Sequence, residues 1–125
     1  MASFAATLNE FQRRSGRSQR AVALAADLDP GRYSRLLSGE RQPASREQVL
    51  GLAQALRLEP PDTDRLVAAA RFLPPSLETV GVDDPAILAL LAALTDPALD
   101  APTRQALRRT VIDIAEHWRP ARAGR

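Results

Sequence analysis

The chain has 125 residues and no cysteine, it is 45% apolar and 26% charged, and its formal net charge is +2. This length fits one domain, or one domain with a small appendage. Without cysteine the chain has no disulfide framework, thiolate zinc site or cysteine nucleophile. The longest wholly apolar run, residues 86–94, is too short to span a bilayer, and the first residues do not form an export signal. We therefore expect a cytoplasmic protein without membrane attachment.

The small net charge is a cancellation between segments of opposite sign. All 17 basic residues are arginine, and residues 1–57 hold nine of them against five acids, whereas residues 58–103 hold two against eight. Residues 104–125 are basic again, with six arginines and two acids. Positive charge clustered in the first segment is typical of a polyanion-binding surface. The alternative interpretation is a solvated surface in a protein from an arginine-rich proteome.

Apolar residues recur at helical rather than strand spacing along almost the whole chain, which predicts an all-α fold. A first helix has Phe4, Leu8 and Phe11 on one face and ends near Gly16, and Ser18 can cap a second helix. The apolar faces of the second to fifth helices are predicted to bury Val22, Ala23, Ala26, Tyr33, Leu36, Leu37, Val49, Leu52, Ala53, Leu56, Leu66, Val67 and Ala70.

Three further helix starts are visible before residue 72. Asp29 and Pro30 predict the third helix, because aspartate accepts hydrogen bonds at an N-cap and proline has the φ of the first helical position. Gly39 ends this helix. A capping-box pattern at residues 45–48 opens the fourth helix, and the prolines at 60–61 open the fifth. Residues 1–72 are therefore predicted to form a complete small domain of five helices.

The remainder of the chain divides into three parts. Residues 73–84 contain two adjacent prolines, a glycine and no helical stripe, and we predict a linker there. Two apolar helices follow in residues 85–119, and residues 120–125 form an arginine-rich tail. Because residues 85–119 are too few for a stable core, their helices must pack on the N-terminal domain or on a second chain. We favour a homodimer, with an interface that contains Ile87, Leu90, Leu91, Leu94, Leu107, Val111, Ile114 and Trp118.

The second and third helices, joined by a tight turn in the basic segment, have the layout of a helix-turn-helix DNA reader. Ala23 is small, as the crossing of the two helices requires. Arg32 and Arg35 lie one turn apart, roughly opposite the face of Tyr33 and Leu36. Both guanidinium groups can therefore point into a major groove, where they match guanine O6 and N7.

These residues closely resemble the lambda-repressor-like helix-turn-helix family, also called the XRE family. The match covers about residues 3–72 and comprises RSQRAVA at 17–23, YSRLLSG at 33–39, ERQP at 40–43 and VLGLAQAL at 49–56. The resemblance implies a five-helix DNA-binding domain whose residues 30–35 read bases. It also implies that Gln19 touches a phosphate, and that Arg41 and Arg46 lie near the DNA backbone or minor groove.

Some positions depart from the family pattern. Asp27 stands at the turn position where the family commonly has glycine, so we expect a slightly strained turn. The proline and glycine at 30–31 offer no side-chain donor, so base reading would depend mainly on Arg32 and Arg35, with Ser34 secondary and DNA shape contributing. The residues predicted to contact DNA are Gln19, Pro30, Gly31, Arg32, Ser34, Arg35, Arg41 and Arg46.

These patterns lead us to expect a dimeric transcriptional regulator, most simply a repressor that binds a near-palindromic operator in double-stranded DNA. We expect no catalysis, cofactor or metal ion, since the single histidine, His117, has no cysteine partner. Two alternatives stay open: a protein-interaction module such as an antitoxin or sigma-factor partner, and a weakly specific chromosome-architectural protein. An enzyme is the weaker alternative, because no phosphate loop or nucleophile motif is visible.

Overall fold

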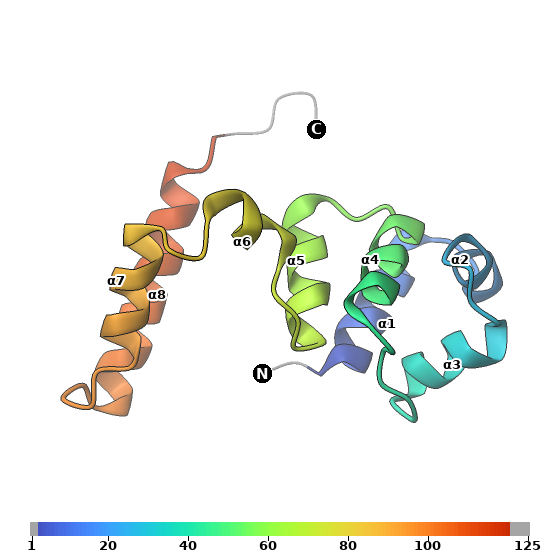
Figure 1. Ribbon diagram of the computed structural model, residues 1–125, viewed down its shortest axis with the longest axis horizontal. Coiled ribbons are helices and arrows are strands. Elements are labelled where there is room, and N and C mark those ends of the chain that lie inside the picture. Colours follow the sequence, from blue (N-terminus) through green and yellow to red (C-terminus); the bar gives the residue numbers. More distant parts are fainter. Residues whose placement is uncertain (1–2, 121–125) are drawn as a thin grey trace. The chain divides into compact units, whose positions relative to one another are not determined.

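The computed structural model describes residues 3–120, and every regular element in that range is an α-helix, as the periodicity predicts (Figure 1). The chain divides into two compact units, residues 1–81 and residues 82–125. The helices are α1 (Phe4–Ser15), α2 (Gln19–Ala25), α3 (Pro30–Ser38), α4 (Arg46–Ala55), α5 (Pro60–Ala69), α6 (Pro75–Val80), α7 (Pro85–Leu94) and α8 (Ala101–Trp118). No helix in the described part of the chain is long and apolar enough to cross a membrane.

One apolar core holds the N-terminal unit together. Helix α1 packs against α3 and α5, and α4 packs against α2 and α5. Almost every residue predicted to face inward is buried, including Phe4, Leu8 and Phe11 on α1, whereas Ala26 and Ala70 lie half-buried at the edge of the core. Burying a large apolar side chain contributes about 1.5–3 kcal/mol, so this core is the main source of stability for the unit.

The predicted helix starts are confirmed by their capping hydrogen bonds. Ser18, Asp29 and Ser45 each accept a hydrogen bond from the backbone N–H three residues further on. The reciprocal bond of the fourth helix differs from the capping-box pattern, because Gln48 Oε1 accepts from the N–H of Ala44, at 2.9 Å, rather than from Ser45. The side chain therefore satisfies the backbone one residue before the cap.

Helices α2, α4 and α5 are followed by residues that adopt a left-handed conformation without being glycine. These residues are Asp27, Arg57 and Arg71, with φ values of 58°, 56° and 69°. In each case two backbone N–H groups close back onto the last turn of the helix, which is the Schellman arrangement. The strain expected at Asp27 is thus a recurring feature of this unit.

The segment predicted to be a linker, residues 73–84, instead contains a short helix, α6, which packs against α5. Asp64 Oδ1 accepts a hydrogen bond from the Ser76 N–H at 3.0 Å, and Arg46 Nε donates to the Leu73 carbonyl at 3.0 Å. The Arg46 guanidinium also forms an ion pair with Glu78. These tertiary contacts, together with the prolines that start the helix, hold α6 in place without an apolar stripe.

The C-terminal unit is a hairpin of α7 and α8. Asp84 and Asp100 cap the two helices through side-chain oxygens. Arg104 of α8 holds the connecting loop, because its Nη2 donates to the carbonyls of Asp96 and Leu99, at 2.9 and 2.7 Å. No residue of α7 or α8 is fully buried. The arginine-rich tail falls almost entirely outside the described residues.

Candidate nucleic-acid interface

Helix α2, a short turn and helix α3 form the helix-turn-helix layout that the sequence predicts. Within the turn the N–H of Asp27 bonds to the Leu24 carbonyl at 3.1 Å, and the N–H of Leu28 bonds to the Ala23 carbonyl at 2.8 Å. Asp29 then caps α3, and Pro30 occupies its first turn. Carbonyls at the end of α2 thus accept hydrogen bonds from two N–H groups of the turn that joins the helices.

Helix α3 has one buried and one exposed face. Tyr33, Leu36 and Leu37 belong to the core, whereas Arg32 and Arg35 point into solvent. Ser34 and Pro30 are also exposed, and Gly31 is half-buried. The outer surface of α3 therefore includes the three side chains that the sequence predicts to read bases, those of Arg32, Ser34 and Arg35.

Gly31 leaves a space on α3 that two polar side chains border. A Cβ atom at this position would lie 2.9 Å from Asp29 Oδ2, 3.6 Å from Arg35 Nη1 and 4.0 Å from Arg35 Nη2. Asp29 Oδ2 is also the atom that caps the helix, at 3.2 Å from the Arg32 nitrogen. The missing side chain thus lets the Arg35 guanidinium lie along the first turn of α3, close to the cap.

A buried hydrogen-bond relay fixes α3 on α1. The Tyr33 hydroxyl donates to Gln12 Oε1 at 2.6 Å, and Gln12 Nε2 donates to the Arg17 carbonyl at 2.7 Å. Burial raises the pKa of the Tyr33 phenol well above its usual value. Burial thus keeps the phenol protonated, and the relay links α3 to the residues just before α2.

Two further side chains position the helices, and sequence reasoning did not single them out. Asn9 Nδ2 on α1 donates to the Leu37 carbonyl at 2.7 Å, near the end of α3. The Arg17 guanidinium donates to the Ala55 carbonyl at the end of α4. No sequence pattern indicates these roles of Asn9 and Arg17. The role of Gln12 in the relay could have been suspected, because Gln12 follows Leu8 by four residues and so lies on the apolar face of α1.

Positive charge on α2 and α3 is not neutralised within the described residues. The ion pairs found in residues 3–120 involve only Arg14, Arg46 and Arg65 as cations. Arg20 on α2 and the two exposed arginines of α3 have no carboxylate within 4.0 Å in that range. These side chains can therefore meet an external anion without breaking an internal ion pair.

The residues predicted to touch the DNA backbone differ in their surroundings. Gln19 is exposed at the first position of α2, and Arg41 is exposed in the loop after α3. Arg46 is only 27% exposed, because its guanidinium is engaged with the Leu73 carbonyl and Glu78. Arg46 thus has a structural role in holding α6 that the sequence did not indicate.

A family model described as a helix-turn-helix domain matches residues 3–66, just over half of the 125-residue chain. The matched range covers α1 to α4 and part of α5, and it includes every residue predicted to contact DNA. No curated protein and no solved structure gives a match to this chain.

Proposed function

The chain belongs to the helix-turn-helix domain family, and we propose that it is a sequence-specific DNA-binding transcriptional regulator. The outer face of α3 carries this proposal. Arg32 and Arg35 are exposed there, and within the described residues no carboxylate pairs with either of them. The major groove of B-DNA admits an α-helix, so α3 can enter it with this face toward the base edges.

In the proposed complex the two arginines read guanine. Each guanidinium can donate two hydrogen bonds to O6 and N7 of one guanine, through a planar, rigid fork that a lysine ammonium lacks. The Ser34 hydroxyl can donate to or accept from a neighbouring base. Because the relay through Tyr33 and Gln12 fixes α3 on α1, the readers are presented on a rigid element.

Other contacts set the position of α3 on the duplex. Gln19 begins α2, where its exposed side chain suits a phosphate oxygen. Arg41 supplies an exposed charge beyond the other end of α3. Arg46 would have to leave Glu78 to reach a phosphate, so we assign it a lesser part in DNA binding.

We also propose that the protein acts as a homodimer joined through the C-terminal hairpin, most simply as a repressor that occludes a promoter. The hairpin has no fully buried residue and exposes large apolar side chains, so it lacks the core that a stable unit of this size requires. The exposed members are Leu88, Leu91, Ile112, Ile114 and Trp118. Two-fold symmetry would place two α3 helices roughly 34 Å apart, on successive turns of a near-palindromic site.

The residues predicted for the dimer interface differ in their exposure on the hairpin. Leu91, Ile114 and Trp118 are exposed and can meet a second chain. The other predicted interface residues are half-buried, and we propose that they line the seam between α7 and α8: Ile87, Leu90, Leu94, Leu107 and Val111. Leu88 and Ile112, which the sequence did not indicate, join the proposed interface.

The test is selection of bound duplexes from a random pool, followed by affinity measurements on the selected site. Replacing both readers, in the variant Arg32→Ala/Arg35→Ala, should remove roughly 1–3 kcal/mol of specific binding for each arginine. Arg57→Ala/Arg71→Ala is the matched control, because it also removes two positive charges, from exposed loop residues outside α2 and α3. Equal binding of the selected site by wild type and the double variant would refute the assignment of readers.

The exposed apolar face of the hairpin also fits a second candidate function, a protein-interaction module whose C-terminal helices dock on another protein. Light scattering separates the two. A dimer that binds the selected palindrome supports the regulator, whereas a monomer that becomes ordered only with another protein supports the module.

A further inference from the structure

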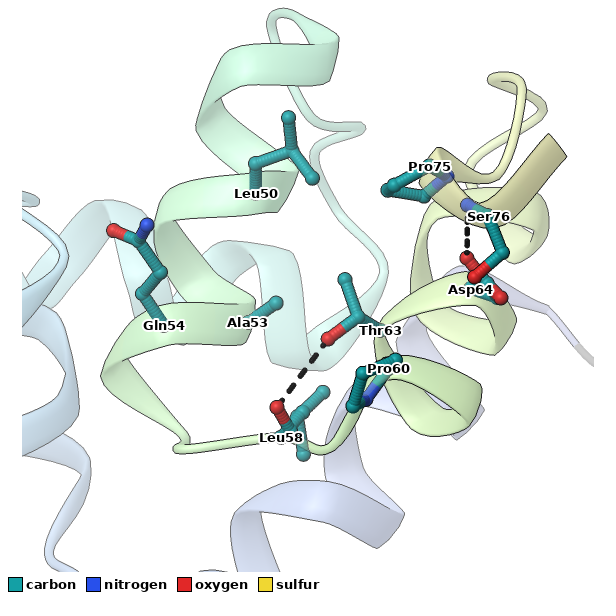
Figure 2. A pocket seen from close by; sticks show the side chains of 9 residues that line it. All are labelled: Leu50, Ala53, Gln54, Leu58, Pro60, Thr63, Asp64, Pro75 and Ser76. Atoms are coloured by element: carbon teal, nitrogen blue, oxygen red, sulfur yellow. Dashed lines mark hydrogen bonds between the residues drawn. The ribbon is translucent and has the colours of Figure 1, made fainter. Parts of the chain in front are cut away.

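An open pocket of about 320 Å³ lies between α4, α5 and α6 in the N-terminal unit (Figure 2). Leu50 from α4, Leu58 from the following loop and Pro75 from α6 supply apolar walls, and Thr63 and Asp64 from α5 supply polar groups. Ligand sites typically begin near 300 Å³ and combine mostly apolar walls with a few polar groups. The pocket meets both conditions.

Fixed elements form the walls of this pocket. Asp64 Oδ1 holds the first turn of α6 through the N–H of Ser76, at 3.0 Å, as Figure 2 shows. Arg46 also anchors this helix, through the Leu73 carbonyl and Glu78. The pocket thus exists without a ligand, so binding requires little reorganisation.

The charge that lines the pocket is negative. Asp64 is the only charged residue among those that line it, and it forms no ion pair within the described residues. The Thr63 hydroxyl lies 3.5 Å from the Leu58 carbonyl, at the limit of a hydrogen bond, so it can turn to another partner. A ligand would meet an apolar surface beside a carboxylate and a hydroxyl.

We propose that this pocket binds a small amphipathic cation, with its apolar body against Leu50, Leu58 and Pro75 and its ammonium group beside Asp64. At about 30 Å³ for each non-hydrogen atom, the share that water takes in the liquid, the pocket holds roughly ten such atoms. An arylalkylamine has this size. An anion is disfavoured, because it would meet the Asp64 carboxylate. This site is separate from α3, and the inference does not depend on the proposed DNA binding.

Three probes of nearly equal shape test the charge preference: phenethylamine, 2-phenylethanol and phenylacetate. Each is titrated into the full-length, isotopically labelled chain without DNA, and amide resonances are followed by NMR. We expect the shifts to cluster at Leu50, Ala53 and Thr63, with the amine bound about fivefold more tightly than the alcohol, the upper range for a partly exposed ion pair. Phenylacetate should bind most weakly.

Asp64→Asn should abolish the preference for the amine, while its amide oxygen can still accept the Ser76 N–H and keep α6 in place. Glu47→Gln is the matched control, since it removes one negative charge from α4 at an exposed residue outside the pocket lining. That variant should retain the preference. Equal affinities for amine and alcohol, shifts confined to other residues, or an unchanged preference in Asp64→Asn would each overturn the proposal.

Discussion

The Tyr33 phenol is the most deeply embedded polar group of α3, with its hydroxyl 2.6 Å from Gln12 Oε1. A buried donor that satisfies a buried amide oxygen is costly to lose, because the partner is then left without a hydrogen bond. The chain has no lysine or cysteine and only one tyrosine. Tyr33 is therefore the only side chain whose ordinary pKa, that of the unfolded chain, lies between about pH 9 and pH 11.5.

We predict that the free energy of unfolding falls as the pH rises above about 10. The unfolded chain releases the phenolic proton near pH 10, whereas burial raises the pKa of Tyr33 in the folded state. Above that pH the folded state binds more protons than the unfolded state, so stability declines by up to about 1.4 kcal/mol per pH unit. Urea denaturation at a series of pH values, with tyrosinate absorbance as a parallel readout, measures the decline.

Tyr33→Phe is the companion variant. It should lower stability by about 1–3 kcal/mol near neutral pH, because Gln12 Oε1 loses its donor, and it should flatten the pH dependence above pH 10. Tyrosinate formation near pH 10 in the folded wild-type protein would contradict this account of Tyr33.

Gly31 and Gly51 are both helical glycines, but they differ in the space around them. Nothing lies within 4 Å of a Cβ added at Gly51, so Gly51→Ala should raise the free energy of unfolding by about 0.5–1 kcal/mol. Gly31→Ala should show no such gain and should weaken binding to the selected duplex, because the new Cβ meets Asp29 Oδ2 and crowds the Arg35 guanidinium. Thermal unfolding and DNA affinity of the two variants are compared, and equal gains in stability would contradict the close approach at Gly31.

Some side chains of the candidate site could be predicted from the sequence, and others could not. The exposed readers on α3 follow from helical spacing, since Arg32 and Arg35 lie opposite a buried face. The engagement of Arg46 with Glu78 does not, because the two residues are far apart in sequence and only the folded chain brings them together. The space at Gly31 depends on a side-chain conformation of Arg35, which no sequence pattern encodes.

Among the elements, the helix ends of α2, α4 and α5 can be made more stable, because each places a residue other than glycine in the left-handed conformation. A side chain with a Cβ costs about 1–2 kcal/mol in this conformation, and glycine avoids most of that cost. Asp27 belongs to the turn of the helix-turn-helix, and Arg57 precedes α5, whereas Arg71 follows α5. Arg71 is thus the one of the three that lies furthest along the chain from the residues proposed to contact DNA.

Arg71→Gly should stabilise the N-terminal unit by about 1 kcal/mol, which corresponds to roughly 4–8 °C in Tm for a unit of this size. Its φ of 69° suits glycine, and its side chain forms no ion pair within the described residues. Arg71→Ala is the control, since it removes the same side chain but keeps the Cβ. A similar rise in both variants would show that the backbone conformation is not the cause.

Helix boundaries were predictable where the signal is local. Serine and aspartate caps, prolines in the first turn and glycines at the end mark α1 to α5, α7 and α8, and all of these lie within a few residues of the element they define. Helix α6 has such a proline start but no apolar stripe. Its stability comes from α5 and Arg46, so it could be found only after folding had placed them beside it.

At the scale of the molecule, the proposed dimer depends on the exposed apolar face of the hairpin. Leu91→Asp should convert a dimer into a monomer of 13.6 kDa, because a carboxylate in an apolar interface is strongly disfavoured. Affinity for the full palindrome should then fall by roughly a hundredfold or more, while binding to one half-site is retained. Sedimentation and light scattering measure the mass.

Leu24→Asp is the matched control, since Leu24 is a leucine of the N-terminal unit that is 80% exposed. Its substitution should leave the oligomeric state unchanged. A wild-type protein that is monomeric at every concentration and on DNA would refute the proposed dimer.

The distribution of aromatic residues makes the two units optically distinct. The single tyrosine, Tyr33, is buried in the N-terminal unit, and the single tryptophan, Trp118, is 78% exposed at the end of α8. Indole emission excited at the red edge therefore reports on the hairpin alone, and phenol absorbance on the α1–α3 contact. One unlabelled sample can thus follow the two units separately, and a blue shift of the emission would show that Trp118 has become buried.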